Sequence, residues 1–272
     1  MSEHGKYMEA GGIMTHFHED GQGDPLLLIH GSGPGVSAWA NWRLVFPALS
    51  KHFRLYAPDV VGFGYTKRPE GIHYSVDVWV DHMISFIETN KLHNLSMIGN
   101  SMGGALALHI AYRRPDLVNK LILMGSVGLS FPITEELDSV WGYSPSFENM
   151  KRLMSTFSYD QTMVKNDNLV QLRYQASIQE GFQEAFASMF PAPRQRHVDA
   201  LALNEEALKS ITKPTLLIHG REDRVIPFEQ TSLKMELLMP NAELHVFSKC
   251  GHWTQIEKTE PFCEQVIQFL SR

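Results

Sequence analysis

Several features that would direct the search for a function are absent from this sequence. The 272 residues include only two cysteines, too few for a disulfide framework, so Cys250 and Cys263 are expected to be reduced thiols in a cytoplasmic protein. No apolar run approaches the roughly 18 residues that a membrane helix requires. Residues 1–12 (MSEHGKYMEAGG) lack the apolar core of a secretion signal. We therefore expect neither secretion nor a membrane partner.

Charge clusters and metal-binding motifs are also sparse. The formal net charge is −6 and no block of lysine and arginine occurs, which argues against nucleic acid or an anionic membrane as a partner. Neither an H-E-x-x-H nor a C-x-x-C motif is present, so we expect no metal and no other cofactor. Because the net charge does not attract anions, an anionic substrate would need a local cation.

The composition is that of a globular protein. Hydrophobic residues make up 43% of the chain and glycine a further 20 residues, which is enough to build a packed core. The length exceeds that of a minimal domain but is short for two complete domains. One domain with an insertion is therefore the expected organisation.

Hydrophobic patterning in the first half predicts an α/β protein. Apolar strands alternate with amphipathic helices, with strands expected at 26–30, 53–57, 95–98 and 121–124 and helices at 39–49, 75–90 and 102–113. Strands separated by helices of ten or more residues pair in parallel. The sequence therefore predicts a mostly parallel central sheet flanked by helices.

The alternation stops near residue 129 and resumes near residue 211. Residues 131–210 contain helical patterns and several prolines but no convincing strand. Beyond this segment, strands are expected at 215–219 and 244–247 and helices at 232–238 and 261–270. We expect an α/β core made of residues 1–129 and 211–272, with residues 130–210 inserted as a helical cap.

The strongest local signal is Gly99-Asn100-Ser101-Met102-Gly103, which matches G-x-S-x-G. The motif follows a predicted strand and opens a predicted helix, which is the setting of a nucleophile elbow. Such a turn is so tight that glycine is needed two positions either side of the serine. It also raises the serine hydroxyl above the sheet, next to free N–H groups of the helix N-terminus. Ser101 is therefore the candidate nucleophile, and a chance glycine-rich turn is the alternative.

A serine hydroxyl needs a base, and the base needs a group that orients it. With this elbow, an acid and then a histidine follow the serine along the chain. Asp223 and His252 each follow a predicted strand, and active groups of open α/β sheets collect at the carboxyl ends of strands. We predict a triad of Ser101, Asp223 and His252, with Glu222 as the alternative acid. His219 ends a strand and is expected to pack in the core.

The loop after the first parallel strand is the second half of the expected site. The oxyanion hole should combine the backbone N–H of Met102 with that of Ser32, or of Gly33 as the alternative. A dinucleotide-binding loop is excluded, because Val36 occupies the third glycine position and Pro34 removes a donor.

Substrate-binding residues are less sharply indicated. Arg173 borders the apolar stripe of a predicted cap helix, where it is either a surface arginine or a clamp for a carboxylate. Asn41 and Asn100 are candidates for further polar contacts, although a plain turn or cap role fits each equally well. Gly33 could approach the substrate through its backbone, and an apolar pocket could be lined by Trp253, Phe131, Trp141 and Met102.

These motifs resemble the α/β hydrolases, and among them the meta-cleavage product hydrolases of aromatic degradation, nearest those acting on 2-hydroxymuconic semialdehyde. The similarity covers the whole chain, including HGSGPGVSAWANWR (30–43), APDVVGFGYTKRP (57–69), GNSMGG (99–104), HGRED (219–223) and GHWTQIE (251–257). Three further segments of similarity lie in the expected cap: SFPITEELDSVWGYSPSF, RYQASI and FPAPRQR. Because cap sequences differ most between sub-families, these segments indicate the substrate class.

The resemblance implies hydrolysis of a carbon–carbon bond in a small-molecule dienoate. The implied substrate is 2-hydroxy-6-oxohexa-2,4-dienoate, which gives formate and 2-oxopent-4-enoate, and methyl analogues would give acetate. Arg173, Asn41 and Asn100 would hold the carboxylate and the 2-oxo end. Ser101 would attack the distal carbonyl, or the triad would activate water instead. Relatives are commonly homo-oligomers, so a dimer or higher oligomer is expected.

The sequence leaves other functions open. Haloalkane dehalogenases and epoxide hydrolases share the scaffold but use a carboxylate nucleophile, which Ser101 contradicts. A carboxylesterase or a cofactor-free perhydrolase is the main enzymatic alternative. A ligand-binding module without catalysis is the alternative from another class, and the complete triad argues against it.

Overall fold

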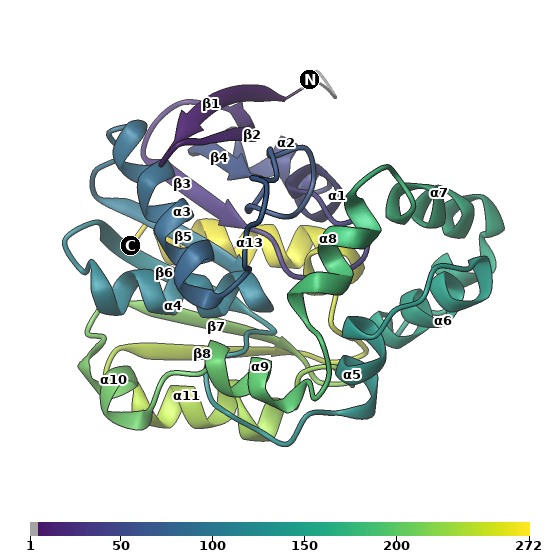
Figure 1. Cartoon of the computed structure of the whole chain (residues 1–272). Helices are drawn as coiled ribbons and strands as arrows, with labels where there is room; N and C mark the ends of the chain where they lie inside the picture. Colours follow the sequence, from purple (N-terminus) through teal and green to yellow (C-terminus); the bar gives the residue numbers. More distant parts are fainter. Residues whose placement is uncertain (1–4) are drawn as a thin grey trace.

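The computed structural model describes residues 5–272, and one eight-stranded sheet forms its centre (Figure 1). Residues 1–4 lie outside the described residues, and so does that part of the N-terminal segment in which no secretion signal is expected. The strand order is β1-β2-β4-β3-β5-β6-β7-β8. The strands are β1 Lys6–Ala10, β2 Ile13–Asp20, β3 Pro25–Ile29, β4 Arg54–Pro58, β5 Leu95–Asn100, β6 Val118–Met124, β7 Thr215–Gly220 and β8 Ala242–Phe247. Strands β3 to β8 pair with one another in parallel. Strand β2 pairs antiparallel with both β1 and β4.

Helices cover both faces of this sheet. Helices α1 (Ala38–Trp42), α2 (Phe46–Leu49) and α13 (Thr259–Leu270) pack on one face, and α3 (Val76–Thr89), α4 (Met102–Arg113) and α11 (Ser232–Leu238) pack on the other. Successive side chains of a strand point to opposite faces, so Leu26 and Leu28 join one core cluster while Leu27 and Ile29 join the other. Burial on both faces explains why the central strands are continuously apolar.

The predicted α/β architecture is confirmed, with two differences of detail. The single helix expected over 39–49 is wrong, because the structure has α1 and α2 separated by a turn. Pro47 lies in the second half of that range, and its ring and missing N–H are incompatible with a helix interior. The second difference is β1, an edge strand whose hairpin with β2 the hydrophobic pattern did not predict.

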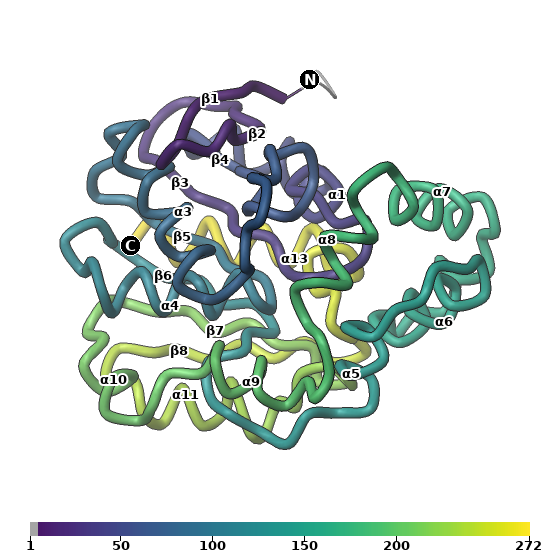
Figure 2. The backbone as a smooth tube through the Cα atoms, viewed as in Figure 1, coloured from purple at the N-terminus to yellow at the C-terminus, as the bar shows by residue number. Residues whose placement is uncertain are grey.

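Every element between β6 and β7 is helical. The chain leaves β6, runs through these helices beyond the sheet and returns to β7, as the tube in Figure 2 shows. They are α5 Glu135–Trp141, α6 Phe147–Phe157, η1 Met163–Lys165, α7 Asp167–Ser177, α8 Phe182–Met189, α9 Gln195–Leu201 and α10 Glu205–Ser210. The side chains of Thr134, Ser146 and Asn166 cap three of these helices by accepting a backbone N–H of the first turn.

His82 of α3 is a buried histidine outside the site described below. Its Nδ1 accepts the backbone N–H of Val61 at 3.1 Å, and its Nε2 lies 2.8 Å from the hydroxyl of Thr15. Burial, and to a lesser extent the neighbouring His30, lower the pKa of His82 to about 4. Between pH 4 and the ordinary histidine pKa near 6.5, His82 is therefore protonated in the unfolded chain but neutral in the folded chain.

We expect the stabilising effect of His82 to disappear in acid. At pH 7 the His82→Gln variant should be less stable than the wild type, because it disturbs two buried hydrogen bonds. As pH falls from 6.5 towards 4, the difference in free energy of unfolding should shrink by up to about 3 kcal/mol. Urea unfolding of both proteins at several pH values measures this difference, and a difference that stays constant with pH contradicts the assignment.

Candidate active site

Ser101 lies in the turn between β5 and α4, in a backbone conformation that is rare for any residue except glycine. Its φ is 54° and its ψ is −116°, so the turn is strained. A Cβ on Gly99 would come within 2.4 Å of the Gly103 carbonyl oxygen, and one on Gly103 within 2.2 Å of the Ile29 carbonyl oxygen. Both glycines of the motif are therefore required by close backbone contacts.

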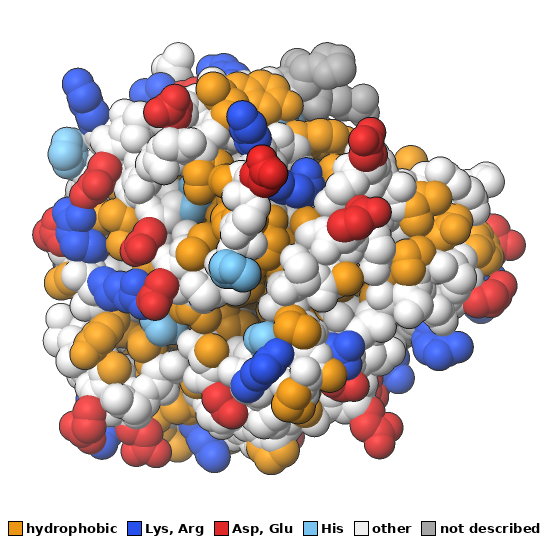
Figure 3. All heavy atoms as spheres, in the orientation of Figure 1, with side chains coloured by type: hydrophobic (Ala, Val, Ile, Leu, Met, Phe, Trp, Pro, Cys, Tyr) orange, Lys and Arg blue, Asp and Glu red, His pale blue; other side chains and the backbone are white. Residues whose placement is uncertain are grey.

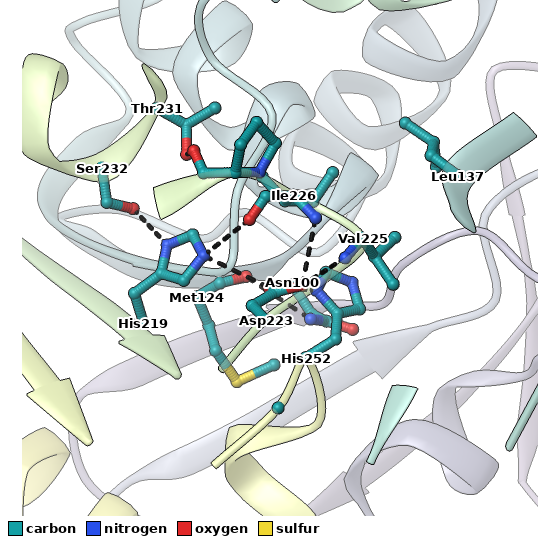
Figure 4. A network of polar contacts seen from close by, with 12 residues as sticks. Asn100, Met124, Leu137, His219, Asp223, Val225, Ile226, Thr231, Ser232 and His252 are labelled. Atoms are coloured by element: carbon teal, nitrogen blue, oxygen red, sulfur yellow. Dashed lines mark hydrogen bonds and ion pairs between the residues drawn. The ribbon is translucent and has the colours of Figure 1, made fainter. Parts of the chain in front are cut away.

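His252 is held by the carboxylate of Asp223. His252 Nδ1 lies 2.7 Å from Asp223 Oδ2, while Asp223 Oδ1 accepts the backbone N–H groups of Val225 at 2.8 Å and Ile226 at 3.0 Å. Figure 4 shows a second imidazole on the same carboxylate, because His219 Nε2 lies 3.2 Å from Oδ2. The carboxylate is completely buried and is surrounded by hydrogen-bond donors.

The protonation of this pair follows from its surroundings. Burial alone would raise the pKa of Asp223, but the charges and hydrogen bonds of His252 and His219 bring it well below its ordinary value. An ionised Asp223 accepts the Nδ1–H of His252, which leaves Nε2 of that ring free to act as the base. Glu222 instead accepts the backbone N–H of Cys250 at 3.0 Å, so the structure brings Asp223 rather than Glu222 to the histidine.

Ser101 and His252 line one cavity between the sheet and the helices that follow β6. Within residues 5–272, neither Ser101 Oγ nor His252 Nε2 has a hydrogen-bond partner, so both are available to a substrate. Catalytic hydrogen bonds are often formed only once a substrate is bound. The predicted site residues in the cavity wall are Ser101, His252, Ser32, Gly33, Asn41, Asn100, Arg173 and Trp253.

The loop after β3 lies directly against the nucleophile. A Cβ on Gly31 would be 2.9 Å from Asn100 Oδ1 and 3.2 Å from the Cβ of Ser101. The hydroxyl of Ser32 accepts the indole N–H of Trp141 at 2.9 Å, which ties this loop to α5. In the described part of the chain, the amides of Met102, Ser32 and Gly33 make no hydrogen bond, as an oxyanion hole requires. The choice between Ser32 and Gly33 stays a prediction.

Three further polar side chains line the cavity, those of Asn41, Asn100 and Arg173. Within the described residues 5–272, Asn41 Nδ2 is buried without a hydrogen bond, and Asn100 Nδ2 makes only a long contact of 3.4 Å with the Met124 carbonyl. Burial, and then the positive charge of Arg43, lower the pKa of Arg173 to about 10, so the guanidinium remains protonated at neutral pH. Arg43 lines the same cavity. The sequence analysis missed it, because its position in a predicted helix did not distinguish it from a surface arginine.

The remaining wall is apolar, and one part of the prediction for it is wrong. Trp253 does line the cavity, and the ring of Phe157 stacks on both His252 and Trp253, with centroid separations of 5.3 and 4.9 Å. Phe131, Trp141 and Met102 are buried but do not line it. Trp141 stacks on Phe190 at 4.4 Å instead, because α5 packs against α8 and α9. The other apolar lining residues are Pro34, Val36, Ala40, Leu153, Met154, Met163, Leu169 and Ile256.

None of the helices formed by residues 5–272 has the length and hydrophobicity that crossing a membrane requires. In the same residues, no three His, Cys, Asp or Glu side chains gather where they could hold a metal ion.

The sheet, the elbow and the Asp–His pair together define the class of protein. Residues 24–259 match the model of the alpha/beta hydrolase fold, and the chain belongs to this family, within which its relatives are the meta-cleavage product hydrolases. It is 54% identical over 270 residues to the 2-hydroxy-6-oxo-2,4-heptadienoate hydrolase of Pseudomonas putida, covering 99% of this chain and 97% of that protein. It is also 54% identical over 269 residues to a 2-hydroxymuconate semialdehyde hydrolase of a Pseudomonas species, covering 99% and 94%.

A solved structure agrees with these sequence relatives. The meta-cleavage product hydrolase of Pseudomonas fluorescens IP01, a serine-to-alanine mutant complexed with acetates, superposes with a TM-score of 0.97. It is 52% identical to this chain, and the match covers 99% of this chain and 98% of that one. The predicted family and fold are therefore confirmed.

Proposed function

We propose that this chain hydrolyses a carbon–carbon bond in a meta-ring-fission product of aromatic degradation, 2-hydroxy-6-oxohexa-2,4-dienoate or its methyl analogue. The observation that carries the proposal is a single cavity that contains the serine, the histidine and also Arg173, a guanidinium with no ion-pair partner within residues 5–272. A simple esterase needs the first pair only. The relatives named above act on substrates of this kind, which supports the choice of substrate.

The cavity suggests how such a substrate would lie. Arg173, Asn41 and Asn100 would hold its carboxylate and 2-oxygen, since a guanidinium can donate two parallel hydrogen bonds to a carboxylate. The apolar wall formed by α6, α7 and Trp253 would cover the carbon chain. The distal carbonyl would then reach Ser101 and the amides beside it.

The chemistry begins with ketonisation of the dienol, so that the departing carbon can leave as a stabilised dienolate. In one route Ser101 attacks the distal carbonyl, His252 Nε2 accepts its proton, and the amides of Met102 and Ser32 or Gly33 stabilise the oxyanion. The carbon–carbon bond breaks, the proton passes to the leaving carbon, and water hydrolyses the acyl-enzyme. In the other route His252 activates water, which forms a gem-diol at the same carbonyl. Both routes require the same triad.

Three wider expectations belong to this proposal. Residues 130–210 would act as the cap of residues 1–129 and 211–272, and the contribution of α6 and α7 to the cavity wall supports this division. We also propose that the protein is cytoplasmic, which its two free cysteines support, and that it forms a dimer or higher homo-oligomer, which rests on the resemblance to its relatives. No cofactor enters either route.

A direct assay tests the proposal. We expect the ring-fission product of catechol or 3-methylcatechol to be cleaved with a kcat/KM at least about 100-fold above that of a nitrophenyl ester, because charged hydrogen bonds to the carboxylate contribute about 1.5–3 kcal/mol each. Loss of the yellow dienoate absorbance measures turnover, and the biphenyl-diol product tests a larger acyl group. A large preference for the ester would indicate a carboxylesterase. Saturable binding with no product over many hours would indicate a ligand-binding module.

A further inference from the structure

Arg43 is a second cation in the catalytic cavity, and the proposed mechanism does not use it. It ends α1, and its Nη1 donates to the Ala40 carbonyl at 2.8 Å, while the remaining guanidinium donors have no partner among residues 5–272. Neither Arg43 nor Arg173 has a carboxylate within 4.0 Å in that part of the chain, and no Asp or Glu lines the cavity. Arginines that do form ion pairs are Arg54, Arg113, Arg114, Arg194, Arg221 and Arg272.

Arg43 and Arg173, which have no ion-pair partner among residues 5–272, place two positive charges in one cavity, where they repel each other. Burial lowers the pKa of Arg43, and burial together with the charge of Arg43 lowers the pKa of Arg173. Both groups are half-buried, so water screens this repulsion incompletely. An anion bound between them would remove the repulsion, and the amide of Asn41, buried without a partner, would add a neutral donor.

The outer surface does not supply this selectivity. On the face drawn in Figure 3, acidic and basic side chains are interspersed, and the net charge of the chain is −6. The preference for an anion must therefore come from inside the cavity, where charges are screened less than at the surface.

We propose that Arg43 is a second substrate-binding cation, which together with Arg173 holds a carboxylate and the oxygen on the adjacent carbon. The ligand class is a 2-oxygenated carboxylate, and the pair favours the form in which the 2-oxygen carries negative charge. This inference rests on the proposed function and deepens it. A simple carboxylate satisfies one guanidinium, whereas a 2-oxy carboxylate with a second negative oxygen satisfies both.

The experiment measures binding to the Ser101→Ala protein, in which turnover does not interfere. Oxalate serves as the probe with two adjacent negative groups and acetate as the probe with one, each competing with the dienoate. We expect a further Arg43→Gln substitution to weaken oxalate binding about 10- to 100-fold and acetate binding by less than about 3-fold. Arg43→Lys should recover part of the oxalate affinity, whereas Arg173→Ala should weaken both probes.

A spectroscopic readout separates binding from a structural role. An ionised dienolate absorbs at longer wavelength than the neutral dienol. With the dienoate bound, Arg43→Gln should therefore raise the pH at which the 2-hydroxyl ionises, since removing a nearby cation disfavours the anion. Glutamine removes the charge while keeping a polar amide at this position. Arg68→Gln is the matched control, because Arg68 is half-buried and donates to a backbone carbonyl but does not line the cavity.

The outcomes distinguish this inference from the proposed function. Equal weakening of oxalate and acetate, or no weakening, overturns the role of Arg43 even if the dienoate is cleaved normally. A lower Tm and slower nitrophenyl ester hydrolysis in Arg43→Gln, with no change in the ionisation of the bound dienoate, would show a purely structural role. If the wild type fails to cleave the dienoate but Arg43→Gln still selectively weakens oxalate binding, the proposed function is wrong, whereas the role of Arg43 in binding two adjacent negative groups is supported.

Discussion

Replacing Ser101 with alanine should reduce turnover of the dienoate by at least about 10³-fold while changing its Kd by only a few-fold. The serine hydroxyl has no hydrogen-bond partner in the described residues, so its loss removes the nucleophile without disturbing a protein contact. Alanine keeps the Cβ and the same backbone conformation. Single-turnover absorbance measurements give the rate, and titration of the inactive protein gives the Kd.

A second substitution at the same position is the control for this result. Ser101→Gly should be equally inactive but more stable by about 1 kcal/mol, because glycine adopts a φ of 54° without the strain that a Cβ causes there. Near-normal turnover of either variant would remove Ser101 from both proposed routes. A small residual rate that depends on His252 would instead favour activation of water.

Replacing Asp223 with asparagine should lower kcat by about 10²- to 10⁴-fold with little effect on KM. An amide can keep the two backbone contacts to Oδ1, but it removes the negative charge that orients and stabilises the His252 ring. Because the pKa of Asp223 is lowered, its carboxylate stays ionised as pH falls through the ordinary range for Asp. In the wild type, the pH dependence of kcat measured from pH 8 down to about pH 3.5 should therefore show no loss of activity caused by protonation of Asp223, whereas an Asp with an ordinary pKa would be half-protonated near pH 3.9.

Glu222→Gln provides the comparison, because Glu222 precedes Asp223 and its carboxylate contacts Cys250 and Arg221 rather than His252. We expect kcat to change less than about 3-fold, with a modest drop in Tm from the altered contact with the Cys250 amide. If Glu222→Gln impairs turnover more than Asp223→Asn, the assignment of the acid is wrong. Equal far-ultraviolet circular dichroism of both variants would show that neither has unfolded.

Prediction from the sequence succeeded where the signal is local. The elbow at Ser101 needs glycines at fixed offsets, and the alternation of strands and helices is determined by hydrophobic spacing along the chain. Prediction failed where two local signals compete. The apolar pattern over 39–49 favours one helix, but Pro47 interrupts it, and the helix divides.

The sequence predicted which residues form the site better than it predicted the contacts that their side chains make. The second imidazole on Asp223, that of His219, was expected only to pack in the core. Trp141 was expected in the cavity wall, but its indole bonds to Ser32 and stacks on Phe190. Side-chain direction depends on how neighbouring elements pack, and a pattern within one element does not contain that information.

The amino-acid sequence by itself determined the parallel sheet, the strained turn at Ser101 and the family, because each is written in short-range spacing or in similarity along the whole chain. Only the tertiary structure decided that Arg43 and Arg173 face one cavity, since they come from helices far apart in the chain. Two like charges meet there because packing of the helical segment against the sheet brings them together. Their shared place in the cavity wall, which no linear motif records, is the basis of our proposal that the pair binds an anion.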